Sequence, residues 1–277
     1  MTDKVKLAGV IGHPIAHSRS PHLHGHWLKR YSISGHYIPM EVAQSDLKSV
    51  LETLPKMGFQ GVNVTLPHKE AVIELADSVT DRASLIGAAN TLTFTADGRI
   101  QADNTDGVGF LANIQDYVPE WSAKSGPCVV FGAGGASRAI IAALCQAGAP
   151  LIRVTNRTRA RSDALKDHFG AKIEVVDWVQ AGNVLGDASL LVNTTSLGMQ
   201  GKSALRVPLD GLRPETVVTD IVYTPLETEL LRTAKAAGCQ TVDGLGMLLH
   251  QAAPGFERWF GTAPEVDMDL RQAVLAS

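Results

Sequence analysis

The sequence predicts an α/β protein of two domains, the second of them Rossmann-like and doubly wound. Apolar strand segments alternate with helical segments in two successive series along the 277 residues. A glycine-rich turn joins a strand to a helix in the second series, and a polar stretch bounded by prolines, residues 119–127, separates the two series. Alternation of this kind is typical of parallel sheets covered by helices, and the chain is long enough for two buried cores.

The first series begins with an apolar strand at 4–12, which ends at Gly12 and Pro14. The helix that follows has Ser20 as its expected N-cap and Pro21 at its first position, where the missing N–H costs nothing. The remaining elements are strands at 35–42 and 59–67, helices at 45–58, 68–77, 80–88 and 106–118, and a hairpin over 90–105 that turns at Asp97 and Gly98. We expect a parallel or mostly parallel sheet here.

The second series has five or six expected strands. It opens with a strand, glycine turn and helix over 128–148 and continues with a strand at 151–157, a helix at 158–170, and strands at 173–178, 190–196 and 216–223. From 244 onward the pattern is helical, and this tail is expected to pack back onto the first domain.

Composition excludes several classes of function. The formal net charge is only -3, with 45% hydrophobic and 19% charged residues, which indicates neither a disordered chain nor a surface for nucleic acid. The three cysteines form no CxxC pair, which favours free thiols in a reducing cytoplasm. No apolar run reaches the length of a spanning helix, and the N-terminus lacks the shape of a secretory signal.

The glycine-rich turn predicts a dinucleotide site. It comprises Gly132, Ala133, Gly134, Gly135 and Ala136, after an apolar strand and before an alanine-rich helix. Glycines at such a turn let the backbone approach a pyrophosphate, which the free N–H groups of the helix N-terminus then bind. Ser137 stands in place of the third glycine of the fingerprint, and an ordinary strand-to-helix turn is the alternative.

The end of the next strand indicates which dinucleotide would bind. NAD-binding domains place an Asp or Glu there for the ribose 2'-hydroxyl. This chain has Asn156, Arg157, Thr158 and Arg161 and no acid. Arginine pairs well with phosphate, so NADP or NADPH is the expected cofactor. A solvated, positively charged turn is the alternative.

Polar loops follow the strands of the first domain, where a substrate facing the cofactor is expected. Lys69 is expected to begin a helix, where the helix dipole lowers the pKa of an amine. Asp106 lies at another loop-to-helix junction and could pair with that lysine. Taken separately, each has an ordinary interpretation, Lys69 as a surface lysine and Asp106 as an N-cap.

The tract "GHPIAHSRSPHLHGH" at 12–26 allows two other hypotheses, a metal site and a hydrolase nucleophile with its base. His22 and His26 are one helical turn apart, but no third ligand is identifiable. We therefore expect His22, His24 and His26 to lie on a helix surface or to pack between the domains, and we expect no metal.

Eight ordered motifs resemble the shikimate dehydrogenase family over nearly its whole length. They are "HPIAHSRSPHLH", "NVTLPHKE", "GAANTL", "ADNTDGVG", "GAGGASRA", "NRT", "NTTSLGM" and "DGLGMLLHQAA". The resemblance implies a substrate-binding domain at 1–105, completed by 243–277, and an NADP-binding Rossmann-like domain at 106–242. The activity it implies is the reversible NADPH-dependent reduction of 3-dehydroshikimate to shikimate, in aromatic amino acid (chorismate) biosynthesis.

The resemblance also assigns roles to residues. It implies that Lys69 and Asp106 are the catalytic pair and that Ser18 and Ser20 bind the substrate carboxylate. The residues expected to hold the ring hydroxyls or the carboxylate are Asn63, Thr65, Asn90, Tyr223 and Gln251. Those expected to contact NADP, besides the glycine turn, are Asn156, Arg157, Thr158, Arg161, Ile221, Gly244 and Gly246.

His68 stands where many relatives carry an aromatic residue, and it could shift the titration of Lys69. The alternatives are an NAD-dependent quinate or dual quinate/shikimate dehydrogenase, an NADP-binding sensor without catalysis, and a metal-dependent hydrolase. The expected partner is a small-molecule substrate, with no nucleic acid and no membrane, and a homodimer is left open.

Overall fold

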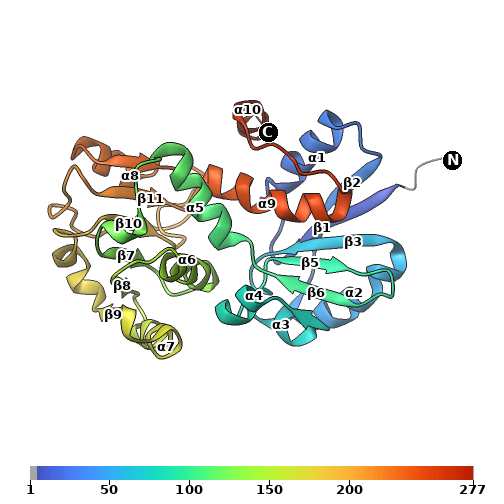
Figure 1. Cartoon of the computed structure of the whole chain (residues 1–277), viewed down its shortest axis with the longest axis horizontal. Coiled ribbons are helices and arrows are strands. Elements are labelled where there is room, and N and C mark those ends of the chain that lie inside the picture. The colour runs from blue at the N-terminus through green and yellow to red at the C-terminus, as the bar shows by residue number, and fades with distance from the viewer. Residues whose placement is uncertain (1–4, 277) are drawn as a thin grey trace. The chain divides into compact units, whose positions relative to one another are not determined.

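The computed structural model describes residues 5–276 and divides the chain into two compact units (Figure 1). The first unit runs up to Gly109 and resumes at Leu248, and the second is Phe110–Met247. The sequence predicted the end of the first segment at 105, four residues before Gly109. It predicted the end of the second domain at 242, five residues before Met247. Helices α5 (Asp106–Tyr117) and α9 (Leu245–Phe260) have residues in both units.

The first unit contains a six-stranded sheet in the order β2-β1-β3-β5-β6-β4. β1 pairs in parallel with β2 and β3, and β4 does so with β6, whereas β5 is antiparallel to both of its neighbours. The sheet is thus mixed, because the hairpin β5–β6 reverses the chain direction. The strands are β1 (Lys6–Gly12), β2 (Gly35–Glu41), β3 (Phe59–Val64), β4 (Ser78–Val79), β5 (Thr91–Phe94) and β6 (Ile100–Asp103). The helices are α1 (Ser20–Arg30), α2 (Leu47–Thr53), α3 (Ala71–Leu75), α4 (Asp81–Ile86) and α10 (Met268–Leu275).

Some element boundaries differ from the sequence expectations. Helix α1 begins at Ser20, so Arg19 is the N-cap residue and Ser20 already lies in the helix. Helix α3 begins at Ala71, so Lys69 precedes the helix instead of starting it. The expected first strand includes Lys4, which lies outside the described residues. Boundaries are the least predictable property of an element because end residues depend on tertiary contacts.

The end of the chain completes the core of the first unit. Trp259 on α9 is 1% exposed and its indole N–H donates to the carbonyl of Leu92, at 3.1 Å. A Cβ on Gly61 of β3 would lie 2.0 Å from the same indole nitrogen. The lack of a side chain at Gly61 therefore lets α9 pack against the sheet.

The second unit contains a wholly parallel sheet in the order β12-β11-β10-β7-β8-β9. Counted within this unit, the order is that of the dinucleotide-binding fold, and its reversal between β7 and β10 marks the expected ligand edge. The strands are β7 (Cys128–Phe131), β8 (Ile152–Thr155), β9 (Ile173–Val176), β10 (Leu190–Asn193), β11 (Val217–Asp220) and β12 (Gln240–Val242). The helices are α6 (Gly135–Gln146), α7 (Arg159–Phe169) and α8 (Glu229–Ala236).

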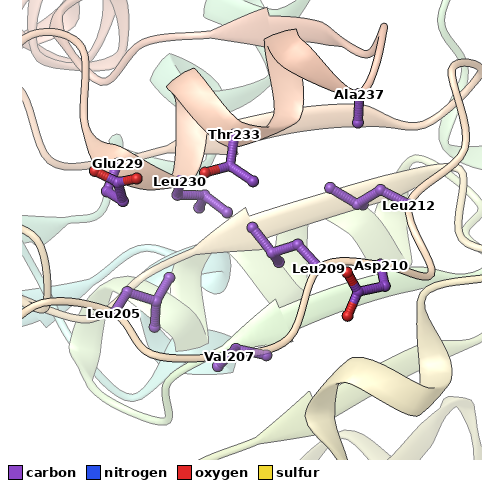
Figure 2. Close-up of a pocket in the computed structure, with 9 residues that line it drawn as sticks. All are labelled: Leu205, Val207, Leu209, Asp210, Leu212, Glu229, Leu230, Thr233 and Ala237. Carbon is purple, nitrogen blue, oxygen red and sulfur yellow. The ribbon is translucent and has the colours of Figure 1, made fainter.

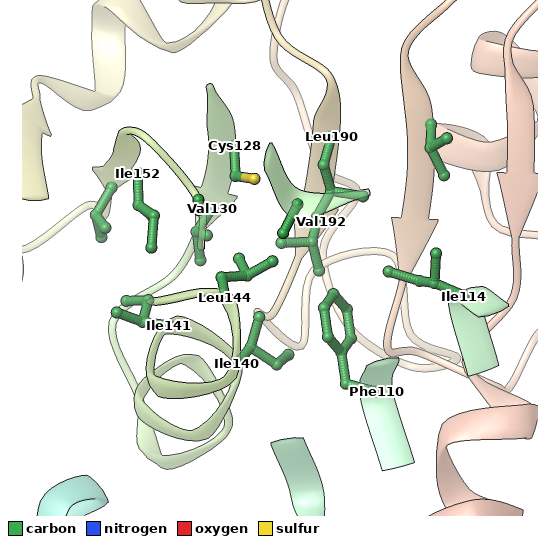
Figure 3. Packing of buried hydrophobic residues seen from close by; sticks show 14 of the residues in the cluster. Phe110, Ile114, Cys128, Val130, Ile140, Ile141, Leu144, Ile152, Leu190 and Val192 are labelled. Atoms are coloured by element: carbon green, nitrogen blue, oxygen red, sulfur yellow. The ribbon is translucent and has the colours of Figure 1, made fainter. Parts of the chain in front are cut away.

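Both faces of this sheet are covered by apolar side chains. Along β7, Cys128 and Val130 join one cluster with residues of α5 and α6 (Figure 3), while Val129 and Phe131 join another cluster on the opposite face. A parallel strand buried on both sides needs a continuous apolar run, and this is why the segment carries no polar alternation. Within residues 5–276 there is no helix that is long and apolar enough to cross a membrane.

Candidate active site

Lys69 and Asp106 form a close ion pair in the first unit. The Lys69 Nζ atom donates to Oδ2 of Asp106 at 2.6 Å, and the side chains are 15% and 7% exposed. Lys69 comes from the loop after β3, and Asp106 begins α5. The backbone N–H of Asp106 donates to Oδ1 of Asn104 at 3.0 Å, which fixes the start of that helix. The pair is a charge-assisted hydrogen bond between two groups of the kind that can exchange protons with a bound molecule.

Asn90 connects this pair to α9. Its Nδ2 atom lies within 3.0 Å of Thr105 Oγ1, Asp106 Oδ1 and Gln251 Oε1, and its Oδ1 atom accepts from the N–H of Thr105 at 2.9 Å. The side chains of Asn90 and Gln251 are 2% and 9% exposed. The Asn90 side-chain amide thus links Asp106 of the ion pair to Gln251 of α9.

Asn63 and Thr65 stand at the end of β3, beside this cluster. The Asn63 Nδ2 atom donates to the carbonyl of Asn90 at 3.1 Å, and its Oδ1 atom accepts from the Tyr37 hydroxyl at 2.7 Å. The N–H of Thr65 donates to the carbonyl of Ile11 at 3.0 Å. The Thr65 bond ties the loop after β3 to the neighbouring strand β1.

Ser18 lies in the loop after β1, and Ser20 is the first residue of α1. That loop is bonded to the loop after β3 through His13 N–H and Leu66 O at 3.0 Å. The N–H of Ser18 donates to Ile15 O at 3.0 Å, and the N–H of Ser20 donates to Ser18 Oγ at 3.3 Å. Ser20 is 6% exposed. Because β1 and β3 are parallel neighbours, the two loops meet at the same edge of the sheet.

Tyr37 on β2 lies among these polar side chains, and no sequence motif identified it. Burial raises the pKa of Tyr37 well above its usual value, against the opposing effect of a hydrogen bond with Ser20. Its hydroxyl thereby connects Ser20 with Asn63. The available signal was a tyrosine in a strand beside β1, since a buried tyrosine hydroxyl needs a polar partner.

The histidines near the N-terminus have different surroundings, and His24 packs inside the first unit, so the expectation of packing between domains is wrong for this residue. His24 is fully buried and stacks on Tyr37 at 3.8 Å between ring centroids, and burial lowers its pKa to about 3. His22 is exposed, while His26 Nε2 lies 3.3 Å from Asp269. No group of three or more His, Cys, Asp or Glu side chains among residues 5–276 could hold a metal ion.

His68, the residue before Lys69 in the sequence, is fully buried. Its Nε2 atom lies 2.8 Å from the carbonyl of Val42, so this nitrogen carries the proton and donates. The ring is thus tied to the segment after β2.

The glycine turn of the second unit leaves open space at the start of α6. Gly134 is the N-cap of that helix, and a Cβ there would meet nothing within 4 Å. Gly132 has a φ of 112°, and a Cβ on it would lie 2.5 Å from Thr194 Oγ1. Ser137, in place of the third glycine, is buried and lies 2.5 Å from the same Thr194 oxygen. The serine therefore binds the end of β10 and leaves the N-terminus of α6 open.

The turn after β8 presents two arginines to solvent. Arg157 and Arg161 are exposed and have no acidic partner among the described residues, whereas Arg159 pairs with Asp177 and lies 3.8 Å from Asp163. The Asn156 side chain donates to the carbonyl of Thr158 at 3.0 Å and so closes the turn. Two uncommitted guanidinium groups at this position suit a phosphate group.

Asp220, the last residue of β11, is hydrogen-bonded to Asn193 at the end of the neighbouring strand β10. Its carboxylate accepts from the Asn193 amide and the Val222 N–H at 3.0 Å and from the Thr228 hydroxyl at 2.8 Å. Burial raises the pKa of Asp220 to about 6, against these hydrogen bonds. Ile221 and Tyr223 follow directly, so Tyr223 belongs to a different unit from the other predicted substrate residues.

The two glycines expected near the cofactor lie where neighbouring atoms approach closely. A Cβ on Gly244 would lie 2.4 Å from the carbonyl oxygen of Ile221, and one on Gly246 would lie 1.8 Å from Asn113 Oδ1. Close packing within the second unit is therefore enough to require glycine at both positions.

A separate pocket in the second unit contains none of the predicted site residues (Figure 2). Six aliphatic side chains line the pocket, together with three polar ones, Asp210, Glu229 and Thr233. Glu229 is already paired with Arg232.

Comparison with known proteins decides the family. Residues 10–92 match the family model for the shikimate dehydrogenase substrate binding domain, residues 115–200 that for shikimate / quinate 5-dehydrogenase, and residues 244–268 that for the shikimate 5'-dehydrogenase C-terminal domain. A protein from Cereibacter sphaeroides named shikimate dehydrogenase (NADP(+)) is 68% identical over 274 residues, which cover 99% of this chain and 98% of that protein. The chain belongs to the shikimate dehydrogenase family.

Solved structures of shikimate dehydrogenase relatives share the fold. Shikimate 5-dehydrogenase from Thermus thermophilus, in complex with NADP(H) and shikimate, has a TM-score of 0.87 at 37% identity and covers 99% of each chain. Quinate dehydrogenase from Corynebacterium glutamicum, in complex with NAD, has a TM-score of 0.91 at 32% identity, again over 99% of each chain. Backbone similarity therefore does not separate the two substrate and cofactor classes within the family, and particular side chains must do so.

Proposed function

We propose that this chain is an NADP-dependent shikimate dehydrogenase that interconverts 3-dehydroshikimate and shikimate. The observation that carries the proposal is the 2.6 Å contact of Lys69 with Asp106 inside the polar cluster of Asn90 and Gln251. Interconversion of a ketone and an alcohol by hydride transfer requires one proton at oxygen, and this cluster has a group suited to supply it.

Lys69 is the proton donor to the substrate carbonyl oxygen and, in the reverse direction, the acceptor of the hydroxyl proton. Asp106 stabilises the ammonium form and orients it. Ser18 and Ser20 bind the substrate carboxylate with neutral hydroxyl groups, and Asn63, Thr65, Asn90, Tyr223 and Gln251 bind the ring hydroxyls or the carboxylate. A site of buried hydrogen-bonding groups rejects analogues that leave those groups unpaired.

The second unit has the features that NADP requires. The open space at Gly134 and the free N–H groups at the start of α6 suit a pyrophosphate, and Arg157 and Arg161 suit the 2'-phosphate. Bound NADPH would supply the hydride. Asn156 and Thr158 shape the turn that presents the arginines, and Ala133, Gly135 and Ala136 with Ile221, Gly244 and Gly246 complete the proposed cofactor contacts.

An NAD-dependent quinate dehydrogenase is the second candidate, because a quinate dehydrogenase in complex with NAD has the same fold over 99% of each chain. The turn after β8 argues against NAD, since it carries two unpaired arginines and no carboxylate for a ribose 2'-hydroxyl.

We also infer a cytoplasmic location, supported by the three free cysteines.

The test measures reduction of NADP and of NAD at 340 nm with shikimate and with quinate, each with and without EDTA. We expect shikimate with NADP to give the highest kcat/KM, by at least about tenfold, and EDTA to leave it unchanged. Equal or better activity with quinate and NAD would assign the chain to the second candidate. Loss of activity in EDTA would indicate a metal-dependent reaction instead.

A further inference from the structure

The segment that carries Ser18 and Ser20 is held by the last helix of the chain. Arg19 lies between the two serines, and its Nη1 atom donates to the carbonyl oxygen of Val274 at 2.9 Å. Val274 is in the last turn of α10, and its side chain is fully buried. A guanidinium at this position binds a carbonyl at the negative end of a helix, where a cation is stabilised.

The contact determines which way the guanidinium points. An arginine between two hydroxyl groups that bind a carboxylate would ordinarily be a third carboxylate ligand, because guanidinium pairs with carboxylate in a bidentate manner. Here that group is committed to α10 instead. The backbone of Arg19 is helical and its carbonyl accepts from the Leu23 N–H at 3.1 Å, so the residue joins the serine loop rigidly to α1.

The other end of α1 is attached to the same C-terminal segment by separate contacts (Figure 1). Arg30 donates to Asp267 at 2.7 Å and to Glu265 at 2.9 Å, and the Trp27 indole donates to the carbonyl of Glu265 at 2.9 Å. The N–H of Glu265 donates to the Tyr31 hydroxyl at 2.9 Å. Loss of the Arg19 contact alone therefore leaves the segment docked.

We propose that Arg19 is a positioning residue, which uses α10 as an anchor to hold the hydroxyl groups of Ser18 and Ser20 in the geometry that binds the substrate carboxylate. This proposal rests on the proposed function for the identity of the substrate. The anchoring of the loop by α10 does not depend on that identity.

The test compares Arg19→Met with Arg30→Met, because these residues stand at the two ends of α1 and each guanidinium contacts the C-terminal segment. We expect Arg19→Met to raise the KM for shikimate about five- to tenfold, with kcat and the KM for NADP unchanged. Arg30→Met should leave all three constants unchanged while it lowers the thermal midpoint. Arg19→Lys should recover most of the loss, because an ammonium group can also donate to Val274 O.

Amide hydrogen exchange provides a readout that does not depend on activity. The peptide with residues 15–20 should exchange faster in Arg19→Met and at the wild-type rate in Arg30→Met. An unchanged KM together with unchanged exchange in Arg19→Met overturns the proposal, and so does an equal KM rise in both methionine variants. If the wild type does not oxidise shikimate, the proposed function fails, and the exchange result alone decides whether α10 anchors the loop.

Discussion

Lys69 combines a charge, partial burial and a single close carboxylate partner. Replacing it with alanine removes the group proposed to exchange a proton with the substrate, while the serine loop and Asn63 are left in place. We expect Lys69→Ala to lower kcat by about 10²- to 10⁴-fold with little change in the KM for shikimate. Steady-state kinetics at saturating NADP measures both constants.

Lys48→Ala is a matched control, because Lys48 is an exposed lysine on α2 whose contact is with Glu52, at 4.0 Å. It should keep the wild-type kcat. If Lys69→Ala turns over at close to the wild-type rate, Lys69 has no catalytic role and is only an ion-pair partner of Asp106.

The arginines after β8 allow a second prediction at single residues. In the double variant Arg157→Ala/Arg161→Ala, the KM for NADP should rise by about tenfold or more, because charge-assisted contacts with a phosphate are lost. The KM for NAD should stay unchanged. Arg159→Ala is the control, since Arg159 is already paired with Asp177. An equal rise for both cofactors in the double variant would place the two arginines away from the 2'-phosphate.

At the scale of elements, the turn from β7 to α6 contains two glycines with different requirements. Gly132→Ala forces a side chain against Thr194 at a positive φ, so the free energy of unfolding should fall by about 1–3 kcal/mol. Gly134→Ala places a methyl group in open space at an extended backbone, so the fold should keep its stability. The methyl group would occupy the approach of the pyrophosphate and should raise the KM for NADP about tenfold.

Urea denaturation and cofactor kinetics on both variants separate these effects. The prediction fails if Gly134→Ala binds NADP as tightly as wild type, because the open space would then have no part in cofactor binding.

Element order was predictable from local sequence, because strand and helix patterns were strong in both units. Patterns within single segments could not show that β5 runs antiparallel to β3 or that Gln240–Val242 forms a sixth strand, since pairing depends on distant partners.

In the site, the motifs identified Lys69, Asp106 and Asn90, and the structure brings all three together. Tyr37 was missed because its hydroxyl acquires its partners only when β2 pairs with β1. The glycines at 244 and 246 have packing reasons that no motif reveals.

At the scale of the molecule, distant parts of the sequence are joined around Asp103. This carboxylate is fully buried. It accepts hydrogen bonds from Arg258 of α9 at 2.6 Å, from the Thr80 hydroxyl at 2.8 Å, and from Nε and Nη2 of Arg82. Burial alone would raise the pKa of Asp103, but the hydrogen bonds from Arg82, Thr80 and Arg258 outweigh it and hold the pKa well below its usual range.

Arg258→Met should therefore lower the free energy of unfolding by about 1.5–3 kcal/mol at neutral pH. Because the folded-state pKa of Asp103 is depressed, the stabilisation is present above the unfolded-state pKa of about 4 and is lost as the pH falls below it. The difference between wild type and variant should shrink in acid. Urea denaturation at pH 7 and pH 3 measures this, with Arg99→Met, an exposed arginine of the hairpin, as control. A difference that is the same at both pH values would contradict the assigned ion pair.

The division of the chain has a consequence for its biosynthesis. The second unit is one continuous stretch, whereas the first begins the chain and is completed only by residues from Leu248 onward, including Trp259. A ribosome therefore delivers all of the second unit before the last helices of the first, so we expect the second unit to fold first although it is not translated first. Until Trp259 has emerged, the sheet face on which it packs at Gly61 and Leu92 stays uncovered, and we expect the nascent chain to be most vulnerable to aggregation there.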